Sequence, residues 1–302
     1  MNLYPVVAYL RHLLAARSTA GYGVHSPYIY DFLTKVVRNK TDVKIVSQVE
    51  NLRLAMLSDK RSITVTDLGA GSVTGAGVER RVAGIARTAA LPAKEAGLLS
   101  RIVRSMLASE VRQSPKAGEH TAWGTEHAGD PPDGGETVPQ SGRARSTEKG
   151  IILELGTSLG ISTLALALAA PGRRVITVEG CPVLAAIARE NLLKYGAANA
   201  EVRAMEFSAA IENLRNEGLS VSFAFIDGNH RGAALTEYVS KIASMGEDMI
   251  IVADDIRLTK EMFRAWRSVA ASGIATVTME TIRLGILFIK HGITPGRYRI
   301  RY

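Results

Sequence analysis

The C-terminal half of the chain alternates short apolar segments with amphipathic ones, and this alternation limits the possible folds more than any other feature. Runs of about five mainly apolar residues predict strands, and the segments between most of them carry apolar residues at helical spacing. The predicted strands are Ile151–Leu155, Arg174–Glu179, Glu201–Met205, Ser222–Asp227, Met249–Ala253, Ala275–Glu280 and Gly285–Lys290. Five successive strand–helix units predict an α/β fold with a doubly wound, mostly parallel seven-stranded sheet. The last two strands leave no room for a helix and predict an antiparallel hairpin at one edge.

The remainder of the chain divides into two parts of different composition. Residues 113–150 are rich in Gly, Pro, Ser, Thr and charged residues and hold almost no aliphatic side chains. Such a segment cannot offset the entropy of ordering, so we predict a disordered linker or loop. It separates a mainly helical N-terminal part, residues 1–112, from the strand-rich domain, residues 151–302. We expect the N-terminal part to help cover an acceptor site.

The charge is unevenly distributed. The net charge is +8, from 37 Lys and Arg against 29 Asp and Glu. Residues 1–110 hold 15 basic and 8 acidic side chains, whereas the rest holds 22 and 21. A basic N-terminal part raises nucleic acid as a partner. We favour the simpler interpretation of a solvated helical surface.

Cysteine content and hydropathy indicate the compartment. The single cysteine, Cys181, excludes a disulfide scaffold and fits a reducing environment. No apolar run reaches the roughly 18–20 residues needed to span a bilayer. The first 17 residues have apolar side chains at helical spacing and no basic segment before them, which predicts an amphipathic helix rather than a signal peptide. We therefore expect a cytoplasmic protein that does not enter the membrane.

The loop after the first predicted strand has the composition of a ligand-binding turn. Gly156 and Gly160 allow the backbone to turn tightly and pass close to a ligand, just before a helix N-terminus. A dinucleotide fingerprint would require glycines at positions 156, 158 and 161, but Ser158 and Ile161 stand at two of them. Glu179 ends the second strand, where a carboxylate can accept hydrogen bonds from ribose hydroxyls. Together with Glu154, these residues suggest an adenosine-containing ligand without a pyrophosphate.

Several of these segments also resemble a known family. ELGTSLGISTL, VITVEG, FIDGNH and IVADDI resemble the class I S-adenosylmethionine-dependent methyltransferases, and among them the metal-dependent O-methyltransferases of the catechol and macrolide-sugar types. The likeness covers about residues 150–290. The whole chain, including GYGVHSPYIYDF near its start, also resembles an uncharacterised methyltransferase family of Bacteroidetes-type bacteria. The resemblance implies a Rossmann-like methyltransferase fold that binds S-adenosyl-L-methionine.

The resemblance also implies roles for the residues that match its cofactor motifs. Glu154, Gly156, Ser158 and Gly160 would line the methionine and ribose side of the cofactor, and Glu179 would hold the ribose hydroxyls. Glu206 and Phe207 would lie near the adenine.

Three carboxylates follow two neighbouring strands of the predicted sheet. Asp227 ends the fourth strand, and Asp254 and Asp255 follow the fifth. Because adjacent strands lie about 4.8 Å apart, these carboxylates can converge, and they repel one another unless a positive charge lies between them. An all-oxygen set favours a divalent metal such as Mg²⁺. A second interpretation is that Asp227 only caps the turn before Gly228.

In the resembled families the corresponding positions bind a divalent metal, and the residue three places after the first aspartate is the catalytic base. Here that residue is His230, so Asp227 and His230 are the predicted catalytic pair. Two acids at positions 254 and 255 match the sugar enzymes more closely than the catechol enzymes, which have Asp-Asn there. The metal would lower the pKa of a substrate hydroxyl, and His230 would take its proton.

Three functions remain open at this stage. The leading hypothesis is metal-assisted O-methylation of a small hydroxylated molecule. The second is methylation of RNA or protein docked on the basic N-terminal part, although no Asn-Pro-Pro-Tyr-like motif follows the fourth strand. The third is a non-catalytic cofactor-binding scaffold.

The predicted edge hairpin would allow a homodimer. Residues 63–72, with Gly69 and Gly71, mimic a cofactor-binding loop, but no second strand ending in an acid follows, so we predict a glycine-rich turn.

Overall fold

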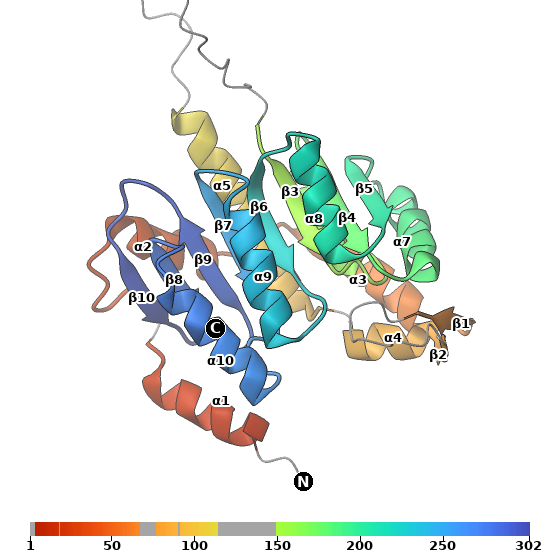
Figure 1. Cartoon of the computed structure of the whole chain (residues 1–302), viewed down its shortest axis with the longest axis horizontal. Helices are drawn as coiled ribbons and strands as arrows, with labels where there is room; N and C mark the ends of the chain where they lie inside the picture. Colours follow the sequence, from red (N-terminus) through yellow and green to blue (C-terminus); the bar gives the residue numbers. More distant parts are fainter. Residues whose placement is uncertain (1–3, 18, 67–76, 90, 114–148) are drawn as a thin grey trace, which may run out of the picture.

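The computed structural model describes residues 4–17, 19–66, 77–89, 91–113 and 149–302 (Figure 1). Its helices are α1 Tyr4–Ala15, α2 Pro27–Asp31, the π-helix η1 Phe32–Val37, α3 Val43–Leu57, α4 Val82–Ala89, α5 Ala93–Gln113, α6 Ile161–Ala169, α7 Pro182–Lys194, α8 Phe207–Asn216, α9 Gly232–Ala243 and α10 Lys260–Ala271. Its strands are β1 Ser62–Val65, β2 Val78–Arg81, β3 Ile151–Leu155, β4 Val175–Glu179, β5 Ala200–Ala204, β6 Val221–Ile226, β7 Met249–Ala253, β8 Val277–Glu280, β9 Gly285–Ile289 and β10 Gly296–Arg299. None of the described helices is both long and apolar enough to span a bilayer.

A mixed, mostly parallel sheet forms the centre of the molecule. Its strand order is β10-β8-β9-β7-β6-β3-β4-β5, and only β9 runs antiparallel to its neighbours. The chain reverses its winding direction between β3 and β6, which are parallel neighbours. In open α/β sheets this reversal opens a crevice at the carboxyl ends of the strands, where ligands bind. The predicted α/β class and doubly wound sheet are confirmed.

The predicted number of seven strands is wrong, because β10 adds an eighth. This strand pairs in parallel with β8. Its sequence, Gly-Arg-Tyr-Arg, is short and polar and has no apolar signal for a strand. The predicted antiparallel hairpin is present as β8–β9, but β10 and β7 flank it. The edge of the sheet is therefore β10, and the hairpin no longer supports the homodimer prediction.

The strands near the centre of the sheet are buried on both faces. Every residue of β3, β6 and β7 is buried, as expected for parallel strands covered by helices on each side. Helices α8, α9 and α10 cover the face that is toward the viewer in Figure 1. Helices α5, α6 and α7 cover the other face.

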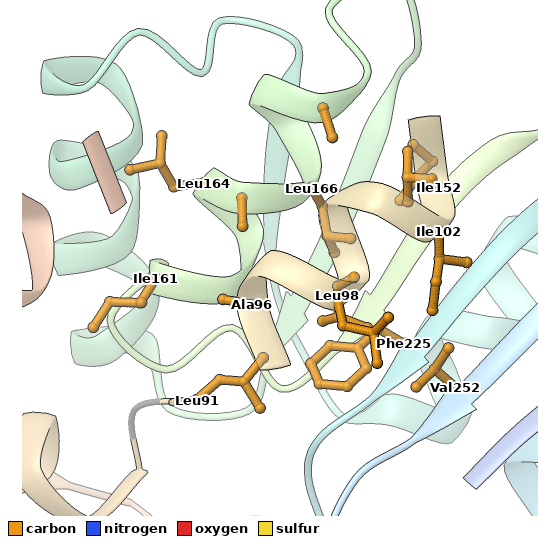
Figure 2. Packing of buried hydrophobic residues seen from close by; sticks show 14 of the residues in the cluster. Leu91, Ala96, Leu98, Ile102, Ile152, Ile161, Leu164, Leu166, Phe225 and Val252 are labelled. Atoms are coloured by element: carbon orange, nitrogen blue, oxygen red, sulfur yellow. The ribbon is translucent and has the colours of Figure 1, made fainter. Parts of the chain in front are cut away.

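The N-terminal helices belong to the same hydrophobic core as the sheet. Leu98 and Ile102 of α5 are fully buried in a cluster with Phe225 of β6 and Val252 of β7 (Figure 2). Helix α3 packs on α6. The N-terminal part is mainly helical, as predicted, and also contains the antiparallel pair β1–β2. Nearly all of the predicted linker, 113–150, lies outside the described residues.

Candidate functional site

A cavity of about 510 Å³ opens at the carboxyl ends of β3, β4 and β6. Both the sheet domain and the N-terminal part contribute to its wall. The sequence-predicted residues in the wall are Gly156, Ser158, Glu179, Glu206, Phe207, Asp227, His230 and Asp255. The wall therefore combines most of the predicted cofactor side with most of the predicted catalytic side.

The loop after β3 approaches the loop after β6 backbone to backbone. Gly156 has a φ of +110°, and a Cβ atom built on it would lie 2.0 Å from the carbonyl oxygen of Asp227. The main-chain N–H of Asp227 donates to the carbonyl of Leu155 at 2.8 Å. A side chain at position 156 would force these two loops apart, so glycine is required by both conformation and space.

Glu179 ties the loops after β3 and β4 together. Its Oε2 accepts a hydrogen bond from the main-chain N–H of Ser158 at 2.8 Å. Its Oε1 accepts one from the N–H of Cys181 at 2.9 Å. Ser158 itself has a φ of +48°, which turns its N–H toward this carboxylate. The carboxylate lies in the cavity wall and can exchange or share these bonds with ligand hydroxyls.

Glu154 lies beneath the loop, and neither it nor Gly160 contributes to the cavity wall. The Glu154 side chain is fully buried and accepts hydrogen bonds from the hydroxyls of Thr163 and Thr177. Its Oε1 has no hydrogen-bond partner among the described residues. Burial raises the pKa of Glu154 to about 7 despite the two threonine hydroxyls, which favour the ionised form. Gly160 is the N-cap of α6, with a φ of +82°.

The wall beyond β5 and β6 is aromatic. Glu206 caps α8 by accepting from the N–H of Ala209 at 2.9 Å, and Phe207 begins that helix. The ring of Phe207 meets the ring of Tyr238 edge to face, with 5.9 Å between centroids. Asn229 donates from Nδ2 to the Tyr238 hydroxyl at 2.9 Å, and its Oδ1 is buried without a partner among the described residues. The sequence prediction missed both Asn229 and Tyr238. Tyr238 reaches the site from the middle of α9, and the role of Asn229 becomes visible only through its hydrogen bond to that tyrosine.

Asp227, Asp254 and Asp255 interact with one another, and an arginine joins them. Asp254 is buried, and both of its oxygens accept from Arg283, at 2.6 Å from Nε and 2.5 Å from Nη2. Asp255, with a φ of +50°, places Oδ1 3.4 Å from Nε of the same arginine. Burial and the Asp254 carboxylate raise the pKa of Asp227 well above its ordinary value.

This arrangement does not fit a divalent cation. Among the described residues, no group of three or more His, Cys, Asp or Glu side chains is placed to hold a metal ion. The oxygens of Asp254 that would coordinate the ion are already bonded to a guanidinium. The metal site predicted from Asp227, Asp254 and Asp255 is not confirmed, because Arg283 supplies the positive charge that these carboxylates need.

The N-terminal part contributes a wall of the cavity whose individual residues the sequence did not predict. Val65, Thr66, Val78 and Arg80 line it from β1, β2 and their flanks, and Leu91 lines it from the segment before α5. Residues 63–65, which we expected to lead into a turn, form most of β1. Gly69 and Gly71 lie outside the described residues. The cover of an acceptor site by the N-terminal part stays a prediction.

Part of the chain that lines this cavity is similar to a known domain type. Residues 153–256 match the family model of a methyltransferase domain. No curated protein matches the sequence.

Three solved structures illustrate the range of structural similarity. The O-methyltransferase from Bacillus cereus in complex with SAH is 15% identical and covers 87% of this chain and 97% of its own, with a TM-score of 0.49. TomG from Streptomyces achromogenes, an O-methyltransferase involved in tomaymycin synthesis and solved with SAM, is 15% identical, covers 87% and 95%, and has a TM-score of 0.48. Cofactor-bound Rv0187 from MTB is 24% identical, covers 46% and 72%, and has a TM-score of 0.39.

The family match and the site coincide in the sequence. The matched segment contains the glycine loop after β3, the carboxylate of Glu179 at the end of β4 and the acidic cluster after β6 and β7. The sheet places all three at one crevice, at the reversal of winding between β3 and β6. Residues 153–256, which match the model of a methyltransferase domain, therefore supply most of the residues that line this crevice from the sheet side.

Proposed function

We propose that this protein transfers the methyl group of S-adenosylmethionine to a hydroxyl oxygen of a small molecule. The observation that carries the proposal is that His230 and Asp255 share one cavity with Gly156, Ser158 and Glu179. A volume of about 510 Å³ is within the range of small-molecule sites. S-adenosylmethionine, when bound, supplies an electrophilic methyl carbon on a positively charged sulfur.

The residues of this chain would bind and orient both reactants. The glycine loop leaves room for the cofactor, Glu179 holds its ribose hydroxyls, and the Phe207 ring packs against its adenine. His230 accepts the proton from the acceptor hydroxyl as the oxygen forms its bond to the methyl carbon and the carbon–sulfur bond breaks. The imidazole then releases that proton to solvent. Holding the oxygen in line with the methyl group supplies much of the acceleration.

The metal-assisted form of this reaction, expected from the sequence, is the competing mechanism. The bonds between Arg283 and Asp254 give it no support. Full activity after dialysis against EDTA would favour the form without metal. Activity that is lost in EDTA and restored by Mg²⁺ would favour the metal-assisted form.

Replacing His230 by alanine tests the proposed base. We expect turnover to fall about a hundredfold, because general-base catalysis commonly contributes that much. The affinity for S-adenosylmethionine should not change. Turnover is measured as transfer of labelled methyl from S-adenosylmethionine into pools of catechols, sugars and hydroxy acids.

His291→Ala is the matched control, because His291 is exposed in the loop after β9 and does not line the cavity. It should retain full activity. Wild-type turnover in His230→Ala would remove His230 from the mechanism. Cofactor binding without transfer to any acceptor in the pools would favour the scaffold hypothesis.

Replacing Glu179 by alanine tests the cofactor side. We expect the dissociation constant for S-adenosylmethionine to rise about thirtyfold, because hydrogen bonds to a charged group contribute about 2 kcal/mol. Isothermal titration calorimetry measures the constant directly, and a thermal melt shows whether the variant folds. Glu212→Ala is the control, since Glu212 lies on the exposed face of α8 and pairs with Lys241. Equal affinities in the two variants would contradict the assignment of Glu179.

A further inference from the structure

The turn between β8 and β9 brings Arg283 into the catalytic end of the cavity. The main-chain N–H groups of Arg283 and Leu284 both donate to the hydroxyl of Thr281, at 3.1 and 2.8 Å. The carbonyl of Arg283 accepts from the N–H of Ile256, just after the acidic cluster, at 3.0 Å. The turn is thus closed on itself and bound to the loop that carries Asp254 and Asp255. The backbone at Arg283 is fixed relative to these carboxylates.

The guanidinium and the Asp254 carboxylate form a two-bond pair in a buried place. The Asp254 side chain is 0% exposed, and its two oxygens meet Nε and Nη2 of Arg283. This parallel pairing matches the planar shapes of both groups and uses one lone pair of each oxygen. The Asp255 carboxylate lies 3.4 Å from the same Nε. Two acidic side chains therefore share one fixed positive charge.

Arg283 also faces the cavity. Its side chain is 29% exposed, and it lines the cavity together with Asp227, His230 and Asp255. A guanidinium carries five N–H donors, and the bonds to Asp254 use two of them. Because Arg283 and His230 line the same cavity, a permanent cation lies in the wall of the site where the acceptor oxygen would gain negative charge as it loses its proton. That is the electrostatic role that a bound metal ion has in a hydroxyl-activating site.

We propose that Arg283 takes the place of a divalent cation in this site. It balances the carboxylates of Asp254 and Asp255 and stabilises the negative charge on the acceptor oxygen. The role at the acceptor oxygen rests on the proposed O-methylation. The exclusion of the metal is a binding property that can be measured without any acceptor, so the two proposals can fail separately.

The test is Mn²⁺ binding, followed by electron paramagnetic resonance of the free ion and by calorimetry. We expect the wild-type protein to leave the Mn²⁺ signal unchanged at millimolar concentrations, with or without S-adenosylmethionine. We expect Arg283→Ala to bind Mn²⁺ at concentrations at least tenfold below those at which the wild type shows no binding, because the carboxylates lose their counter-charge. Adding Asp254→Asn to Arg283→Ala should abolish this binding.

Two results, one for the wild type and one for Arg283→Ala, would overturn the proposal. One is Mn²⁺ binding by the wild-type protein that Asp254→Asn removes, and this measurement does not depend on any arginine variant folding. The other is a folded Arg283→Ala that binds no Mn²⁺. Should Arg283→Ala fail to fold, Arg283→Lys is the variant to measure, since it keeps the positive charge. Arg283→Lys is expected to leave Mn²⁺ unbound, and binding by this variant would also contradict the proposal.

Discussion

Replacing Gly156 by alanine is expected to lower the free energy of unfolding by about 4 kcal/mol or more, among the largest effects of single substitutions. Two costs combine. A non-glycine residue is strained at a φ of +110°, and the added Cβ would lie 2.0 Å from the Asp227 carbonyl oxygen. The neighbours in this contact are backbone atoms, so the overlap cannot be relieved by rotating a side chain. The loops after β3 and β6 must separate, and the cavity wall between them is lost.

Urea denaturation measures the loss of stability, and the shift of the melting temperature with S-adenosylmethionine measures the loss of binding. Gly196→Ala is the matched control. Gly196 has a φ of +80°, and no heavy atom lies within 4 Å of a Cβ built there. It should cost about 1 kcal/mol, the penalty for the backbone conformation alone. If the two variants lose similar stability, the contact between the loops is not what requires glycine at position 156.

The sequence predicted the elements whose signal is local. The buried parallel strand β7 is an unbroken apolar run, and β3 is interrupted only by Glu154; the observed bounds of both strands equal the predicted ones. Gly156 and Glu179 were recognisable because Gly156 directly follows β3 and Glu179 is the last residue of β4, where the topology of the sheet decides what lies nearby. Strand β10 was not recognisable, because its residues alternate weakly and its pairing with β8 depends on a long-range contact.

The part of the site that the sequence did not predict comes from long-range packing. Arg283 is separated from Asp255 by α10 and β8, and no spacing rule relates an arginine in a hairpin turn to the acids that follow β7. Thr66 and Arg80 reach the cavity from a separate two-stranded sheet. From the sequence alone, three acids that follow neighbouring strands suggest a bound cation. Only the folded chain shows that a side chain supplies one.

Glu154→Gln is expected to make the protein more stable at alkaline pH. Burial raises the pKa of Glu154 to about 7 from its ordinary 4.5, so the folded protein holds a proton that the unfolded chain releases. The stability contributed by this proton is fully present below the unfolded pKa and is lost as the pH rises through the folded pKa. The total loss is about 3 kcal/mol, of which about 2 kcal/mol develops between about pH 5.5 and about pH 8.5. Glutamine keeps an oxygen for the Thr163 and Thr177 hydroxyls and has no such loss.

Urea denaturation of both proteins at these two pH values gives the difference in stability, and contributions from all other titrating groups cancel in that difference. We expect the free energy of unfolding of the variant, relative to that of the wild type, to rise by about 2 kcal/mol from the lower to the higher pH. Glu212→Gln, on the surface of α8, is the control for the change from glutamate to glutamine itself. Parallel pH profiles of the wild type and Glu154→Gln would mean that Glu154 is ionised in the folded protein over this range. The carboxylate beneath the glycine loop would then be stabilised by its two threonine hydroxyls more strongly than burial destabilises it.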